Sequence, residues 1–141
     1  MASAPIPKAK AMATRVYVTS AELRLQLRLA SSARDPRVAA YLTASGPDER
    51  AFYLSEAHLR LAARGRTGER PSFRRGDARP VTGEAMQVPL TFLPTSVLVP
   101  AGYRLGLRFA SWDGPSFEPG EDFESDVLPG SRLRLPARWR A

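Results

Sequence analysis

Residues 22–30, ELRLQLRLA, alternate without a break between polar and apolar side chains. Leu23, Leu25, Leu27 and Leu29 share one parity, and charged or amide side chains fill the other. Side chains of a β-strand point to opposite faces with a period of two, whereas an α-helix repeats every 3.6 residues. The segment therefore predicts a strand with one face in a core and the other in water.

A second region, residues 83–109 (GEAMQVPLTFLPTSVLVPAGYRLGLRF), shows the same alternation twice. The apolar parities are Met86, Val88, Leu90 and Phe92, and then Tyr103, Leu105, Leu107 and Phe109. We interpret the region as two half-buried strands joined by a Pro/Gly corner.

Further strands are predicted at residues 15–19, 38–45 and 131–136, the last ending the chain with Leu133 and Leu135 inward. Residues 51–64, AFYLSEAHLRLAAR, also fit one face of a helix. We interpret them as a short apolar start followed by a strand at 58–63, with Leu59 and Leu61 inward.

Two long surface loops separate these strands. Residues 65–82 are polar and rich in Arg, Gly and Pro, with Phe73 and Val81 as apolar anchors. Residues 111–130 are irregular and hold six acidic residues. The fold class predicted is all-β: a single domain, residues 1–141, forming a jelly-roll-like two-sheet β-sandwich of the galactose-binding-like type with about seven or eight strands.

The net charge of +7 and the pI of 10.7 suggest a nucleic-acid partner. The arginines are spread over nearly every segment, however, and no recognition helix or RNA-stacking aromatic strand is visible. We therefore expect no nucleic-acid partner. No apolar run approaches the roughly 20 residues of a membrane span, and the N-terminus lacks the apolar stretch of a secretory signal, so we expect no membrane association and a cytoplasmic location.

Catalytic chemistry is not predicted. His58 is the only histidine, it falls inside a predicted strand, and no Gly-x-Ser-x-Gly sequence is present. One histidine and no cysteine leave only carboxylates as metal ligands. We expect no catalytic residues, no cofactor and no metal. The acidic residues between 113 and 126 lack the regular spacing of a calcium loop and are interpreted as a solvated loop, with ion binding left open.

Arginines occupy the outward parity of several predicted strands. They are Arg24, Arg28, Arg60, Arg104, Arg108, Arg132 and Arg134. If some of these strands are neighbours, guanidinium groups line one sheet face. Such a face is either simply solvated or a docking face for an acidic partner surface.

Four landmarks, in order, resemble the C-terminal β-sandwich domain of the Xaa-Pro dipeptidyl-peptidase and cocaine-esterase type of serine hydrolases, which include α-amino-acid ester hydrolases. Residues 14–42 are similar to "V-T-G … L-x-L … S-s-x-x-D-t-d-f-x-a-x-L", and residues 58–64 to "L-R-A-S-x-R". Residues 83–111 are similar to "G-E-x-x-x-v-x-i-x-L-x-P-T-s-x-v-f-x-a-G-H-R-L-R-L-x-i-s-S", and residues 131–136 to "S-R-L-x-L-P". The resemblance covers nearly the whole chain.

The chain departs from that pattern at Tyr103, where the family has histidine, at Gly106, where it has a second arginine, and at Ala57-His58, where it often has glycine. The resemblance implies an accessory, substrate-gating sandwich that packs on an α/β-hydrolase domain, in cis or in trans. The Ser-Asp-His triad belongs to that other domain, so no catalytic residue carries over to this chain. A homo-oligomer is left open.

The alternative is an independent sandwich that binds a ligand such as carbohydrate. Exposed aromatic side chains would then stack on sugar rings. The candidates are Trp112 and Phe117, in the loop of residues 111–130, together with Tyr53 and Trp139.

Overall fold

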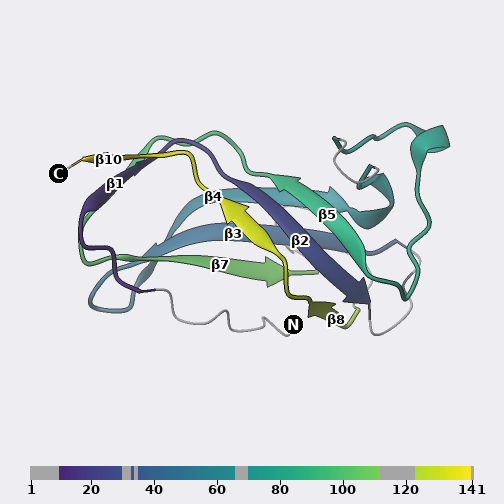
Figure 1. The fold of residues 1–141 in the computed structure, drawn as a ribbon, viewed down its shortest axis with the longest axis horizontal. Helices are drawn as coiled ribbons and strands as arrows, with labels where there is room; N and C mark the ends of the chain where they lie inside the picture. Colours follow the sequence, from purple (N-terminus) through teal and green to yellow (C-terminus); the bar gives the residue numbers. More distant parts are fainter. Residues whose placement is uncertain (1–9, 30–32, 34, 66–69, 112–122, 141) are drawn as a thin grey trace.

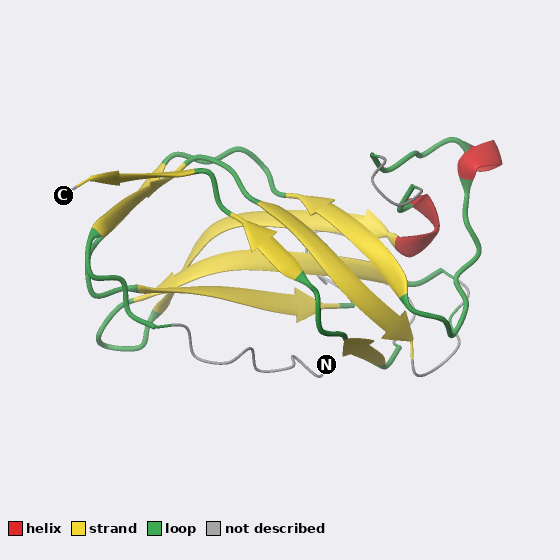
Figure 2. Cartoon of the chain, in the orientation of Figure 1, coloured by secondary structure: helices red, strands yellow, loops and turns green. Residues whose placement is uncertain are grey.

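The computed structural model describes residues 10–29, 33, 35–65, 70–111 and 123–140, which form a β-sandwich of two layers (Figures 1 and 2). The strands are β1 (Arg15–Val18), β2 (Glu22–Leu29), β3 (Arg37–Ser45), β4 (Ala51–Arg60), β5 (Met86–Thr91), β6 (Val97–Val99), β7 (Arg104–Ala110), β8 (Ser125–Val127), β9 (Arg132–Arg134) and β10 (Ala137–Arg140). Two 3-10 helices, η1 (Leu61–Ala63) and η2 (Arg75–Asp77), complete the regular structure. The predicted all-β sandwich is confirmed, with more strands than expected.

The front layer in Figure 1 consists of two antiparallel sheets that continue one another. One has the order β5-β2-β8 with β9 also paired to β2, and the other has the order β10-β1-β6. Consecutive strands β1 and β2, β5 and β6, and β9 and β10 therefore form three paths that run through both sheets. Backbone bonds from Phe92 N–H to the Ala21 carbonyl and from Thr95 N–H to the Thr19 carbonyl, both 3.0 Å, bridge the break. The front layer is one long ribbon with a bend near residues 19–21.

The back layer is a three-stranded antiparallel sheet in the order β4-β3-β7. Its central strand β3 is buried along most of its length. Small side chains such as those of Ala39 and Thr43 are covered there as well. A tight turn joins β3 to β4, in which Gly46 N–H bonds to the Arg50 carbonyl at 3.3 Å.

The core lies between the two layers. The leucines of β2 are 1–7% exposed, as their alternation predicts, and they belong to one apolar cluster with Val88 and Leu90 of β5 and Leu42 and Leu59 of the back layer. Full burial of one such side chain stabilises a fold by about 1.5–3 kcal/mol. The inward leucines of β2 therefore form the main contribution of the front layer to this core.

Residues 51–64 do not fold as predicted. β4 is continuous from Ala51 to Arg60, and the backbone then turns into η1 instead of continuing as a strand. Leu59 and Leu61 are both buried, at 5% and 0% exposure, but Leu61 reaches the core from the 3-10 helix.

Residues 83–109 also differ from the prediction, since they contain three strands. β5 pairs with β2 and β7 pairs with β3, so the two longer strands lie in different layers. The Pro/Gly corner between them holds β6, which pairs with β1. The predicted inward parity is buried in β5, whereas the corresponding side chains of β7 are only partly buried.

The end of the chain and the two loops bring further corrections. The strand at Arg132–Arg134 is not the last, because β10 follows it and pairs with β1. β8 lies inside the region predicted as a loop of residues 111–130. In the loop of residues 65–82, Val81 packs against the core but Phe73 is 79% exposed and anchors nothing.

No helix in the described ranges is long and apolar enough to cross a membrane.

Candidate partner-binding surfaces

The described contacts of His58 are with Glu56 and Tyr41. Its Nε2 is 3.7 Å from Glu56 Oε1, and its ring meets Tyr41 edge-on at a centroid distance of 5.9 Å. The hydroxyl of Ser55, on the same strand, donates to the Leu93 carbonyl at 2.6 Å. A catalytic histidine must hold a nucleophile on one nitrogen and an orienting acid on the other. The contacts that the structure describes for His58 join β4 to Tyr41 of β3.

The acidic side chains that the structure describes do not converge on a metal position. Within the described ranges, no group of three or more His, Cys, Asp or Glu side chains could hold a metal ion. Of the acidic residues between 113 and 126, Glu124 and Asp126 belong to the described part of the chain, and Asp126 forms an ion pair with Arg28 at 3.4 Å. The remaining ones lie outside the described residues.

The seven arginines of the proposed docking face divide between the two layers. Arg24 and Arg28 are on β2 and Arg132 and Arg134 are on β9, all in the front layer. The others are in the back layer: Arg60 is on β4, and Arg104 and Arg108 are on β7. Because β2 and β9 pair directly, the structure brings Arg24, Arg132 and Arg134 together. Arg28 lies farther along β2, beside β8, and the last three are in the other layer.

Charges on the front layer face one another in a defined register. Glu22 is opposite Arg134, Arg24 is opposite Arg132, and Arg28 is opposite Asp126. Two of these three cross-strand pairs combine opposite charges, which favours the pairing. The pair of Arg24 and Arg132 combines like charges. The front face therefore has positive charge concentrated at its middle.

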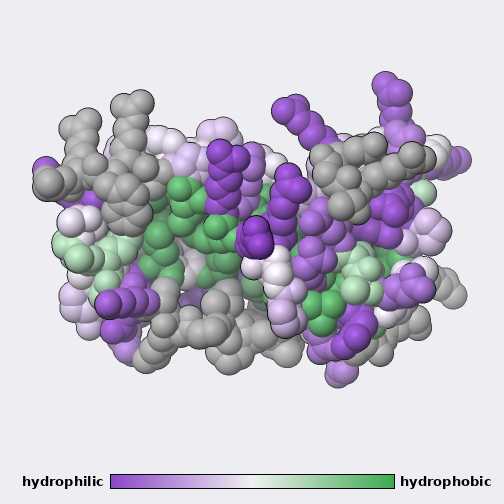
Figure 3. All heavy atoms as spheres, viewed as in Figure 1, coloured by the Kyte–Doolittle hydropathy of each residue, from purple (hydrophilic) through white to green (hydrophobic). Residues whose placement is uncertain are grey.

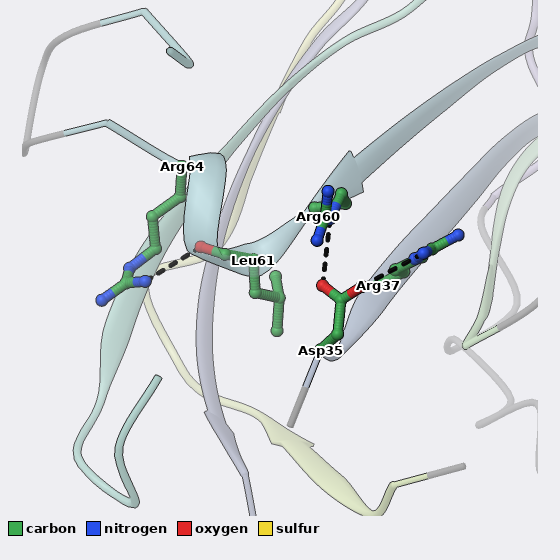
Figure 4. Close-up of polar contacts among 5 residues, drawn as sticks. All are labelled: Asp35, Arg37, Arg60, Leu61 and Arg64. Atoms are coloured by element: carbon green, nitrogen blue, oxygen red, sulfur yellow. Dashed lines mark hydrogen bonds and ion pairs between the residues drawn. The ribbon is translucent and has the colours of Figure 1, made fainter. Parts of the chain in front are cut away.

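Arg60 serves a different purpose, because it is tied to the start of β3 (Figure 4). Arg60 Nε donates to Asp35 Oδ1 at 3.0 Å, and an Arg37 guanidinium nitrogen donates to Asp35 Oδ2 at 3.1 Å. Partial burial alone would raise the pKa of Asp35, but the hydrogen bonds from Arg60 and Arg37 outweigh it and hold that pKa below its usual value. Arg60 thus fixes the ends of β3 and β4 and is not a free member of a docking face.

Arg64, just after η1, is buried with 7% exposure. Its guanidinium donates to the carbonyls of Leu61 (2.9 Å), Arg79 (3.2 Å) and Pro80 (2.7 Å); the bond to Leu61 is drawn in Figure 4. Burial lowers the pKa of Arg64, and the charge of Arg79 lowers it further. The side chain holds the segment that leads toward β5 against the end of β4.

One edge of the sandwich leaves apolar side chains accessible. β7 is an edge strand of the back layer, and its side chains Leu105, Leu107 and Phe109 pack only partly against the core. Across from it, Leu133 of β9 is partly buried and Val127 of β8 is 46% exposed. We call these five residues the open edge. Figure 3 shows hydrophobic surface between hydrophilic side chains on the front of the molecule.

The proposed ligand-contact residues can be placed only in part. Trp112 and Phe117 lie outside the described residues. Trp139 belongs to β10, of which the backbone is described. Tyr53, on β4, is 58% exposed, and burial followed by the charge of Glu56 raises its pKa.

Three polar residues of structural importance were not singled out by the sequence patterns. They are Asp35, Arg64 and Ser131. Ser131 Oγ accepts a bond from Gln26 N–H at 2.9 Å and donates to the Leu128 carbonyl at 3.0 Å, which fixes the turn between β8 and β9. Each of the three stands inside a landmark of the family resemblance, and that position was the available signal. In the structure Arg64 and Ser131 bond to backbone groups, and Asp35 binds the side chains of Arg37 and Arg60.

Comparison with solved structures agrees with this architecture. Two crystal structures of a CocE/NonD family hydrolase from Staphylococcus aureus resemble the chain with TM-scores of 0.68 and 0.63, each at 14% sequence identity. The similarity covers 92% and 88% of this chain but 30% and 26% of those chains. This chain thus spans less than a third of the length of the hydrolase it resembles.

A comparison with curated protein sequences gives no match. Residues 22–133 match the model of one family, described as the X-Pro dipeptidyl-peptidase C-terminal non-catalytic domain. The match runs from the first residue of β2 to the middle of β9 and so includes both layers of the sandwich. It agrees with the family resemblance of the four sequence landmarks. The chain belongs to the family of X-Pro dipeptidyl-peptidase C-terminal non-catalytic domains.

Proposed function

We propose that the chain is an accessory domain of a serine hydrolase of the α/β-hydrolase class, which packs on the catalytic domain in cis or in trans and helps to shape the substrate entrance. Membership of a non-catalytic domain family supports this role. The hydrolase that resembles this chain is more than three times as long as the matched region, so a sandwich of this kind occurs there beside much additional protein.

The observation that carries the proposal is the open edge. Its side chains on β7, β8 and β9 are apolar and lie on strands that belong to different layers. Partly exposed apolar side chains that are grouped together mark protein interaction sites more often than scattered ones do. A stable interface buries about 800 Å² on each partner, and an entire sandwich edge with its flanking loops can supply such an area.

The opposite edge also carries exposed apolar side chains, Phe52, Tyr53 and Leu93, but there the two layers are joined to each other. There Leu93 N–H donates to the Glu56 carbonyl at 2.9 Å and Ser55 Oγ donates to the Leu93 carbonyl at 2.6 Å, so polar bonds join the layers. The apolar side chains of β5 beside them are buried. We call this the closed edge, and we place the catalytic domain on the other one.

The test is binding of the purified chain to a hydrolase that carries a Gly-x-Ser-x-Gly sequence and is encoded beside it, measured by light scattering after size exclusion. Val127→Asp places a charge on the open edge, and Leu93→Asp places the same charge at the closed edge, where Leu93 is 56% exposed. Both positions are exposed, so both variants should fold. We expect Val127→Asp to abolish the complex and Leu93→Asp to leave it intact. Equal binding by the two variants contradicts the proposal.

A second test concerns the absence of chemistry in the chain itself. The isolated chain should release no product from aminoacyl-proline anilides or simple esters, and a serine-reactive phosphonate should not label it. Turnover that the phosphonate abolishes would show that the chain is an enzyme. Binding to a glycan array that is lost on Tyr53→Ala would instead favour the carbohydrate-binding alternative.

A further inference from the structure

Two arginines oppose each other at the centre of the front face. Arg24 on β2 and Arg132 on β9 are cross-strand partners, and both side chains are exposed. Directly opposed residues of an antiparallel pair have their Cβ atoms about 5 Å apart. Within the described part of the chain, no salt bridge or hydrogen bond neutralises either guanidinium group.

The neighbouring positions on β2 differ from this pair, although arginines also face each other in other registers, as Arg37 and Arg60 do on either side of the Asp35 carboxylate. Toward one end of the strands Glu22 stands opposite Arg134, and toward the other Arg28 is paired with Asp126 at 3.4 Å. On the far side of Arg24 the partner strand β5 presents Pro89, which carries no charge. The central pair is therefore the one cross-strand pair of like charge among the register partners of β2.

Like charges placed directly opposite each other destabilise a sheet. A carboxylate held between them would remove the repulsion and could accept paired hydrogen bonds from guanidinium groups, the geometry for which arginine is best suited. The repulsion lowers the stability of the unbound domain, and binding of a carboxylate restores that stability. Repulsion built into an exposed position is thus a reason to look for an acidic ligand there.

We propose that Arg24 and Arg132 form a clamp for a single carboxylate of an acidic protein segment. The inference rests on the proposed accessory function, since the segment would belong to the partner domain. The flanking acids favour a protein over a nucleic acid: a phosphate backbone that ran along the strands would meet Glu22 and Asp126 within a few residues. An isolated Asp or Glu side chain avoids both.

The first measurement needs no partner and concerns stability. Arg24→Gln and Arg132→Gln should each raise the midpoint of thermal unfolding at low salt. The midpoint of the double variant should be little higher than that of either single variant. The gain should disappear at about 0.5 M salt, because screening then limits charge–charge repulsion to a distance of only a few ångströms. Unchanged or lower midpoints for both single variants would overturn the clamp, because the two charges would then not repel.

The second measurement uses the full chain and a fluorescent peptide whose glutamates are separated by several neutral residues, so that one carboxylate at a time can reach the clamp. The affinity for this peptide should fall about tenfold in the Arg24→Gln/Arg132→Gln variant, as expected when charged hydrogen bonds are lost. The matched control is Arg104→Gln/Arg108→Gln, which removes two exposed charges from β7, where the register partners are Ser45 and Tyr41. The control should lose less than about threefold.

Equal losses in the two double variants would mean that net charge alone attracts the peptide, and the clamp would be rejected. Competition by single-stranded DNA of equal charge at equal concentration would also reject it, in favour of a phosphate ligand. Neither result depends on the hydrolase. Failure of the clamp is therefore distinguishable from failure of the accessory function, which the hydrolase-binding experiment decides.

Discussion

The two edges of the sandwich differ although the same kind of sequence builds both. At the closed edge the apolar parity of β5 is buried and hydrogen bonds from Ser55 and Leu93 join the layers. At the open edge the apolar parity of β7 is only half-buried, and in the described residues β7 shares no sheet with β8 or β9. Alternation in sequence therefore tells which side chains face inward but not how completely they are covered. This difference is the basis of our proposal that the open edge contacts the catalytic domain.

The largest expected effect comes from making the same truncation at both edges. Leu90→Ala at the closed edge removes a side chain that is 2% exposed, and it should lower the free energy of unfolding by about 3 kcal/mol. Leu107→Ala at the open edge removes a partly exposed side chain and should cost about 1 kcal/mol. Urea unfolding of the two variants measures the difference. Equal costs would mean that the edges do not differ in folding.

The next effect concerns the polar support of the closed edge. Arg64→Met keeps most of the side-chain volume but leaves the Arg79 and Pro80 carbonyls without the guanidinium donor, while the Leu61 carbonyl keeps only the Arg64 N–H at 3.3 Å. Leaving buried acceptors unsatisfied should lower the free energy of unfolding by about 2–3 kcal/mol. Arg79→Met is the control, since Arg79 contributes a single bond to the Gly65 carbonyl at 2.7 Å. A smaller loss of stability for Arg64→Met than for Arg79→Met would show that the hydrogen bonds of Arg64 to this segment are unimportant.

Asp35 is expected to make a smaller, pH-dependent contribution. Its pKa is lower in the folded chain than the ordinary value of 3.8, so the folded state releases its proton more readily than the unfolded state. The stabilisation is complete above about pH 4 and is lost as the pH falls through the lowered pKa. Asp35→Asn should cost about 1 kcal/mol at pH 7 and much less near pH 2. A cost that does not depend on pH would contradict the role assigned to the ion pairs.

The smallest effect is expected at the open edge, where one hydroxyl holds the turn between β8 and β9. Ser131→Ala removes the acceptor of Gln26 N–H and should cost about 1 kcal/mol. Its sharper readout is hydrogen exchange, because the Gln26 amide should lose protection while the Leu23 amide keeps it. Unchanged exchange at Gln26 would show that Ser131 is not needed there.

The sequence predicts the long strands of this fold better than the short ones. β2 and β5 are long enough to show several cycles of alternation, and their inward residues are buried. β6, β8 and β9 have three residues each, which is less than two full periods, so pairing with β1 or β2 decides their conformation. The switch from β4 to η1 is hidden for a related reason, since Leu61 faces the core in either conformation.

The sequence indicated which residues point outward, but it did not indicate which of them share one surface of the folded chain. The outward arginines could be identified by parity, yet strand order alone separates Arg24 and Arg132 from Arg104 and Arg108. Arg64 looks like any surface arginine in the sequence, because its partners are backbone carbonyls of residues 61, 79 and 80. Such partners depend on where the chain folds back and not on residue type.

The bend that interrupts the front ribbon has a consequence for how its length can vary. Three neighbouring paths cross it, at residues 19–21, 92–96 and 135–136. Adding or deleting one residue in a single path would shift the pairing register of the strand on one side of the bend. A register shift of one residue turns every side chain of that strand to the opposite face of the sheet. The three connections are therefore coupled in length, and relatives that gain or lose a residue in one of them are expected to compensate in the other two.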